Sequence, residues 1–374
     1  MNSSQVFYPF ETAPHSYFAI ENFEQAKKDF LTGRSTSPIF DYHERFTNEA
    51  IDDRISKLID GTPAQRKLLL VKIAVKLQEN DSYLFAFKHL NSEIYGEVSC
   101  DYFDRAIKFL LGKYSDVELS TICDDENCRK LIEYTKNLPE RPLIDSNSYR
   151  KMKRYFRKYF SDLTPSRSIG EAMQKVFKIS KLAERGWVLE EKDDSSHART
   201  IFKSKTITYG KKYKARSNDK FVYNSIALHE IFGHAVRETG AKLDNSESSE
   251  GWAVLLEQLN GPNFKTKRAY RYLAAALATG VYDGKELNFS DTFNIIWRLM
   301  SLSGRYTQKN TKRHAFDEVA RVFRGGRPDL PGAAFLKDTA YLKGNLDIWD
   351  AISRQKINYD DFIEIIEGRK EILQ

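Results

Sequence analysis

Apolar side chains recur at helical spacing through the N-terminal third of the chain. Residues 66–78 and 101–111 place them at i, i+3, i+4 and i+7, the pattern of an amphipathic helix. Pro63 marks a helix start, because proline is tolerated in the first turn. We therefore predict helices through most of residues 23–114.

Residues 135–148 interrupt this pattern. They carry two prolines and few apolar side chains, which is typical of a linker. Helical spacing returns over residues 149–160 and 169–185. We predict two domains, an N-terminal helical region over residues 1–145 and a second domain over residues 146–374.

A different pattern begins after residue 186. Three short runs are rich in β-branched and aromatic residues and are separated by polar segments, as strands are. They cover residues 187–190, 198–202 and 205–209. We predict that they form a small antiparallel sheet, followed by helix beyond residue 219. The expected fold class is α+β, mostly helical.

Composition excludes two broad classes of protein. The 374 residues are 41% hydrophobic and 30% charged, which is enough apolar material for a sizeable core, so global disorder is not expected. The longest apolar stretches, such as residues 272–281, run for about ten residues, whereas a membrane-spanning helix needs about 20. No secretory signal is visible in the first thirty residues.

Cysteine is sparse in this chain. Cys100, Cys123 and Cys128 are too few for a disulfide framework, and their number is odd. The spacing of Cys123 and Cys128 is compatible with half of a metal site, but no second pair follows, so we expect reduced and inert thiols. This cysteine usage, with no visible secretory signal, predicts a cytoplasmic protein.

Positive charge is concentrated in one stretch. The whole chain has 59 Lys and Arg against 52 Asp and Glu, a net charge of +7. Residues 150–220 alone hold 20 basic and 8 acidic residues, a surplus of 12. One interpretation is an ordinary solvated surface. The other is a basic surface that attracts an acidic partner, either nucleic acid or an acidic peptide tail.

The most specific chemical pattern is the string HEIFGH over residues 229–234. Zinc peptidases carry the related string HExxH, in which two histidines four residues apart share one helical face. Here His234 follows His229 by five residues, which puts the two rings about 140° apart around a regular α-helix of about 100° per residue. A single π-turn would absorb the extra residue, and Gly233 lowers the steric cost of that distortion.

A buried helix with these polar groups needs a partner for them, and a cation would serve both imidazoles. A catalytic zinc site also needs a third protein ligand. Ser249 resembles a helix N-cap, which would put Glu250 in the first turn of the next apolar helix. Four other residues remain alternatives for the third ligand: Asp244, Glu247, Glu257 and His314.

These motifs resemble those of the microtubule-associated tyrosine carboxypeptidases and their bacterial relatives. In that family a HExxxH helix is followed by a helix with an (E/Q)EGLA motif, whose glutamate is the third zinc ligand. The second motif stands here as SEGWA over residues 249–253, which points to Glu250. Further likeness lies in residues 321–326 and 337–342, and the resemblance extends over most of the chain.

The resemblance implies a zinc-metallopeptidase-like catalytic core in the domain 146–374, with Zn²⁺ held by His229, His234 and Glu250. Glu230 would act as the general base, taking the proton of the attacking water and passing it to the leaving amine. Tyr341 is a candidate hydrogen-bond donor to the oxyanion that forms during the reaction.

A carboxypeptidase also needs a cation for the carboxylate at the substrate's C-terminus. Arg321 and Arg324 are three residues apart, hence on one helical face if the helix persists to the glycines at 325 and 326, and arginine suits bidentate capture of a carboxylate. Lys337 is a third candidate.

The function expected from these features is a zinc-dependent carboxypeptidase acting on an acidic peptide or protein tail. The resemblance implies tyrosine as the residue removed. We expect no membrane partner and no nucleic acid. Two alternatives stand beside this hypothesis: a zinc hydrolase of internal or non-peptide amide bonds, and a non-catalytic binding protein that uses the basic stretch.

Overall fold

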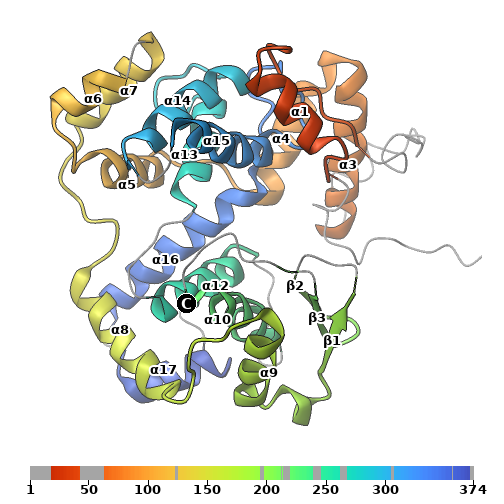
Figure 1. The fold of residues 1–374 in the computed structure, drawn as a ribbon, viewed down its shortest axis with the longest axis vertical. Helices are drawn as coiled ribbons and strands as arrows, with labels where there is room; N and C mark the ends of the chain where they lie inside the picture. Colours follow the sequence, from red (N-terminus) through yellow and green to blue (C-terminus); the bar gives the residue numbers. More distant parts are fainter. Residues whose placement is uncertain are drawn as a thin grey trace, which may run out of the picture. The chain divides into compact units, whose positions relative to one another are not determined.

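The computed structural model describes residues 18–42, 63–122, 125–193, 198–211, 213, 220–238, 246–261, 268–304, 307–355 and 357–370 (Figure 1). The described chain forms two compact units. The first unit takes up the described parts of Met1–Arg141 and Arg268–Thr339, and the second unit those of Pro142–Lys267 and Ala340–Gln374.

This division corrects the expected domains 1–145 and 146–374. The first break, after residue 141, lies close to the predicted one, but residues 268–339 return to the first unit. Helical periodicity identifies which face of a helix is buried. It carries no information about which of two cores that face enters.

The described residues of the first unit form helices joined by loops, with an isolated β-bridge between Ile20 and Tyr42. Its helices are α1 (Phe23–Leu31), α3 (Pro63–Glu79), η4 (Asp81–Tyr83), α4 (Leu84–Tyr95), α5 (Cys100–Leu111), α6 (Asp116–Ile122), α7 (Glu126–Lys136), α13 (Ala269–Thr279), α14 (Phe289–Ser301), α15 (Gln308–Phe323) and η7 (Leu336–Thr339). The apolar helix α13 is buried along almost its whole length and packs against α5, α14 and α15. Apart from Arg271, which pairs with Glu318 at 2.7 Å, α13 is largely apolar, as expected of a helix in the centre of a core.

The second unit contains the sheet and the candidate site. Its elements are α8 (Ser146–Tyr159), α9 (Ile169–Ser180), η5 (Leu182–Arg185), β1 (Val188–Lys192), β2 (Ala198–Ile201), β3 (Thr206–Gly210), α10 (Val222–Leu228), η6 (His229–Ala235), α11 (Val236–Glu238), α12 (Ser246–Asn260), α16 (Ala340–Arg354) and α17 (Tyr359–Ile366). One hydrophobic core joins these helices to the sheet, and Phe232, Trp252 and Trp349 are among its largest side chains.

The predicted fold class, α+β and mostly helical, is confirmed, but the sheet is not wholly antiparallel. Its strand order is β1-β3-β2. β2 pairs with β3 antiparallel, and β1 pairs with β3 parallel, with Val188 opposite Thr206. Side chains alternate with the same period in parallel and antiparallel strands, so the sequence pattern predicts strands without their direction.

The cysteine expectation also needs correction. Cys128 is buried and disulfide-bonded, whereas Cys100 is exposed and free. Cys123 lies outside the described residues.

Within the described part of the chain, none of the helices combines the length and the apolar character that crossing a bilayer requires.

Candidate metal centre

The helix that carries the HExxxH string has the predicted irregularity. α10 and α11 are regular, and between them η6 is a π-helix over His229–Ala235. Hydrogen bonds from i to i+5 place residues five apart on one side of the helix. The His229 and His234 rings therefore lie close together, with centroids 4.9 Å apart.

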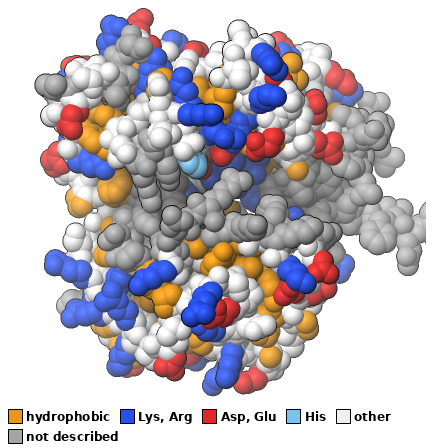
Figure 2. Space-filling model, in the orientation of Figure 1, with side chains coloured by type: hydrophobic (Ala, Val, Ile, Leu, Met, Phe, Trp, Pro, Cys, Tyr) orange, Lys and Arg blue, Asp and Glu red, His pale blue; other side chains and the backbone are white. Residues whose placement is uncertain are grey.

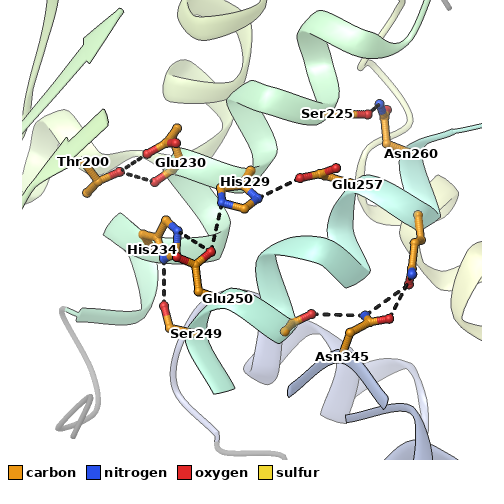
Figure 3. A network of polar contacts seen from close by, with 12 residues as sticks. Thr200, Ser225, His229, Glu230, His234, Ser249, Glu250, Glu257, Asn260 and Asn345 are labelled. Carbon is orange, nitrogen blue, oxygen red and sulfur yellow. Dashed lines mark hydrogen bonds and ion pairs between the residues drawn. The ribbon is translucent and has the colours of Figure 1, made fainter. Parts of the chain in front are cut away.

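A third donor comes from α12, which packs against η6. Oε2 of Glu250 lies 3.4 Å from Nε2 of His229 and 3.7 Å from Nε2 of His234 (Figure 3). One donor atom from each residue falls within 4.8 Å of the other two, a spacing that a single cation can bridge. The three side chains are 12–17% exposed, so the cluster is largely shielded from solvent.

The outer nitrogens of the two rings are held by side chains of α12. Nδ1 of His229 lies 2.8 Å from Oε1 of Glu257, and Nδ1 of His234 lies 2.7 Å from Oγ of Ser249. A ring that donates from Nδ1 keeps the lone pair of Nε2 for a metal. Two imidazoles and one carboxylate form a donor set that zinc favours. The residues present therefore fit a zinc ion.

The other candidates for the third ligand have different positions. Glu257 contacts His229 at the outer nitrogen rather than joining the cluster. Glu247 pairs with Lys343, at 3.1 Å. His314 lies on α15 in the first unit, and Asp244 lies outside the described residues.

The electrostatic environment of the cluster favours positive charge. Burial by itself lowers the pKa of His229, but the hydrogen bonds and negative charges of Glu250 and Glu257 outweigh burial and raise this pKa to about 10. Metal binding requires neutral imidazole. A bound cation would therefore replace the proton as the positive charge between these two carboxylates.

Two glycine contacts bring the helices close enough to form the cluster. A Cβ on Gly233 would lie 2.5 Å from Cβ of Ala253 on α12. A Cβ on Gly251 would lie 2.1 Å from the carbonyl carbon of Gly344 on α16. Gly233 thus allows η6 to approach α12, a role different from the backbone flexibility expected from the sequence. Gly251, next to Glu250, allows α12 and α16 to cross backbone to backbone.

A buried polar network holds α12 and α16 in register. Gln258 and Asn345 exchange two side-chain hydrogen bonds, at 2.9 and 3.2 Å. Asn345 also donates to the main-chain oxygen of Gly251, and the Trp349 indole donates to Gln258. Fully partnered networks of this kind specify one packing arrangement. They fix the rotation of α12 and with it the direction of the Glu250 side chain.

The glutamate of the HExxxH string contacts the sheet. Oγ1 of Thr200 on β2 lies 2.9 Å from Oε2 of Glu230 and 2.8 Å from its main-chain oxygen. Figure 3 shows the Glu230 carboxylate directed toward Thr200, whereas the Glu250 carboxylate lies between the two histidines. The neutral hydroxyl holds one carboxylate oxygen and leaves the other available.

The comparison with protein families bears on this site. Residues 238–368 match the model of the microtubule-associated tyrosine carboxypeptidase family. The resemblance expected from the sequence is confirmed over this range. The matched range includes Glu250 and begins after the HExxxH string. Comparisons with curated proteins and with solved structures found no match.

The remaining predicted site residues all lie within the family-matched range. Tyr341 is half-buried on α16 in the second unit. Arg321, Arg324 and Lys337 belong to the first unit. Arg321 Nε lies 2.9 Å and Arg324 Nη2 lies 3.0 Å from the buried carboxylate of Asp338. These two arginines thus have a structural partner, and the substrate-binding role of the three basic residues stays a prediction.

Sequence analysis named Glu257 and Ser249 in other roles and missed Thr200. Glu257 follows Glu250 by seven residues, two helical turns, and so shares its face. Ser249 was expected to be an N-cap, but α12 already begins at Ser246, so its hydroxyl is available to His234. Thr200 had no signal, because its contact with Glu230 joins segments 30 residues apart.

Proposed function

We propose that this protein is a zinc-dependent metallopeptidase of carboxypeptidase type. The observation that carries the proposal is the convergence of His229, His234 and Glu250 within 4.8 Å, next to Glu230 in the chain. The match to a carboxypeptidase family supports the class of reaction, and the name of that family suggests tyrosine as the residue removed.

The residues of the site divide the chemistry between them. When bound, zinc supplies Lewis-acid activation of a water molecule and of the scissile carbonyl. Glu230 takes the proton from the attacking water and delivers it to the leaving amine as the peptide bond breaks. Thr200 orients the Glu230 carboxylate through its hydrogen bond to Oε2. Glu257 and Ser249 hold the imidazole rings in position.

The rest of the proposal concerns the substrate. Tyr341 is the candidate hydrogen-bond donor to the developing oxyanion. Arg321, Arg324 and Lys337 are the candidate cations for the substrate's terminal carboxylate. The substrate we propose is a peptide or protein tail, acidic in character because residues 150–220 carry a surplus of 12 positive charges.

Cleavage of peptides with a free or a blocked C-terminus tests this function. Zinc-loaded protein is incubated with matched peptides that end in Tyr, Phe or Ala, each with a free or an amidated terminus, and products are identified by mass spectrometry. We expect loss of one C-terminal residue from the free peptides and none from the amidated ones. Equal cleavage of amidated peptides would instead support the alternative hydrolase of internal amide bonds.

A further inference from the structure

A basic groove lies on the second unit, formed by α8 and the C-terminal end of α16. Its volume is about 840 Å³, and its lining includes Arg150, Lys151, Arg154, Arg157, Ser353 and Gln355. Figure 2 shows Lys and Arg side chains gathered over α8, at the lower left of this face. The basic residues of the groove belong to the stretch 150–220, in which the sequence concentrates positive charge.

The positive charge of this groove is only partly compensated by the surrounding protein, since Asp145 and Asp361 interact with Arg150 and Lys151 without forming ion pairs. α8 contains six Lys and Arg and no Asp or Glu. Among the described residues, no acidic side chain forms an ion pair with Arg150, Lys151, Arg154 or Arg157. Arg150 instead bonds the main-chain oxygen of Ser146 and the side chain of Asn147. A concave surface with unpaired charge of one sign concentrates ligands of the opposite sign.

The aromatic residues beside the groove do not favour nucleic acid. Lys151 Nζ lies 5.9 Å from the ring centroid of Tyr155, and Lys158 Nζ lies 3.9 Å from that of Tyr359. The two rings also pack edge to face against each other, with centroids 5.5 Å apart, so less ring surface is left for the bases of a single strand to stack on.

The position of α8 relates the groove to the metal centre. Tyr149 of α8 contacts the main-chain oxygen of Gln258 at 3.5 Å, and buried Lys153 donates to that of Gly261. Glu250 lies ten residues before Asn260, the last residue of α12 and the one that precedes Gly261, which is about 15 Å of helix at 1.5 Å per residue. An extended peptide covers at most about 3.3–3.6 Å per residue, so about five residues are needed to span that distance.

We propose that the α8–α16 groove binds an acidic segment of the substrate tail, at least about five residues before the bond that is cleaved. The proposal rests on the proposed carboxypeptidase function, because that function places the cleaved bond at the C-terminal end of the tail. It assigns the groove to substrate capture, at a distance from the residues that perform the chemistry.

Binding of two isomeric peptides tests this assignment. Both carry a fluorescent label and four glutamates, placed either six to nine residues before the C-terminus or directly next to it. Fluorescence anisotropy with zinc-loaded Glu230→Gln full-length protein measures affinity without turnover. We expect the peptide with distant glutamates to bind at least about fivefold more tightly, because several exposed charge pairs contribute together.

Charge reversal in the groove provides the matched comparison. Arg154→Glu/Arg157→Glu should abolish the advantage of the distant glutamates. Arg167→Glu/Lys178→Glu makes the same change of net charge at exposed positions outside the groove and should preserve that advantage. Three results would overturn the proposal. They are an equal loss of the affinity advantage in both double variants, equal affinity for the two peptides, and tighter binding of an oligonucleotide of equal charge. Because no turnover is measured, failure of wild-type protein to cleave peptides would count against the proposed function alone.

Discussion

At the scale of single residues, the site separates groups that would bind metal from groups that orient them. His229 and His234 turn Nε2 toward Glu250, and their Nδ1 atoms are engaged by Glu257 and Ser249. Both glutamates are therefore close to a histidine, but they approach different nitrogens. This difference predicts different consequences when each glutamate is replaced.

Removing a ligand should abolish zinc binding, and removing an orienting group should weaken it. We expect His234→Ala and Glu250→Ala to lose zinc on dialysis. Glu257→Gln should retain zinc with about 10–100-fold lower affinity. The amide fills the same position but no longer offers a carboxylate as the hydrogen-bond acceptor for the His229 ring. Elemental analysis and competition with a chelator measure both effects. Complete loss of zinc from Glu257→Gln would mean that Glu257, not Glu250, is the ligand.

Glu230 is predicted to act in proton transfer and not in metal binding. Glu230→Gln should keep zinc and the fold but lower kcat by about 10²–10⁴, because an amide cannot accept the proton of the water. Single-turnover kinetics with a peptide substrate, together with zinc content and circular dichroism, separate these properties. Retained activity would show that another group carries out the proton transfer.

At the scale of elements, the site depends on close helix contacts. η6 approaches α12 at Gly233, and α12 approaches α16 at Gly251 and Gly344. A Cβ on Gly344 would lie 2.0 Å from the main-chain oxygen of Glu247. Main-chain atoms and the Cβ of Ala253 cannot move aside as the end of a long side chain can, so an added methyl group must push the helices apart.

Gly251→Ala should destabilise the protein and impair the metal centre. Overpacking costs about 1–3 kcal/mol, occasionally more, and here the obstacle is backbone. Displacement of α12 would also move Glu250 away from the histidines. Gly170→Ala on α9 is the matched control. Its new Cβ would meet the Tyr209 ring at an ordinary 3.4 Å, and alanine favours helix by up to about 1 kcal/mol. Thermal unfolding and zinc affinity should fall only in Gly251→Ala.

At the scale of the whole molecule, the first unit has its own polar centre. Asp338 is 2% exposed and pairs with Arg321, Arg324 and Arg271, the last at 3.4 Å. Burial raises the pKa of Asp338, but the charges of Arg324, Arg271 and Arg321 outweigh burial and hold it well below its usual range. This carboxylate joins α13, α15 and η7, segments that the sequence separates widely.

Asp338 should therefore make stability depend on pH in acid. A depressed folded-state pKa contributes stability that is present above the unfolded value of about 3.9 and is lost as pH falls through the folded value. Asp338→Asn should cost about 3–5 kcal/mol at neutral pH, because it leaves buried arginines without their partner. Calorimetry from pH 7 down to pH 2 should show a smaller acid loss in the variant. Equal acid loss in both proteins would contradict this account.

The sequence by itself determined the elements and the core of the site. Helical periodicity located α3, α5, α8 and α9 to within a few residues. The five-residue spacing of His229 and His234 had one geometric solution on a helix, and the π-helix was predicted from it. Such inferences succeed because they depend on residues within one or two turns of each other.

Only the tertiary structure decided how the elements pair and pack with one another. It made β1 parallel to β3, returned residues 268–339 to the first unit and brought Thr200 to Glu230. It also gave Gly251 its role at the crossing of α12 and α16. The physical reason is that packing and hydrogen bonding depend on distance in space. Local spacing along a chain specifies which face of an element is buried, but not the partner that covers it.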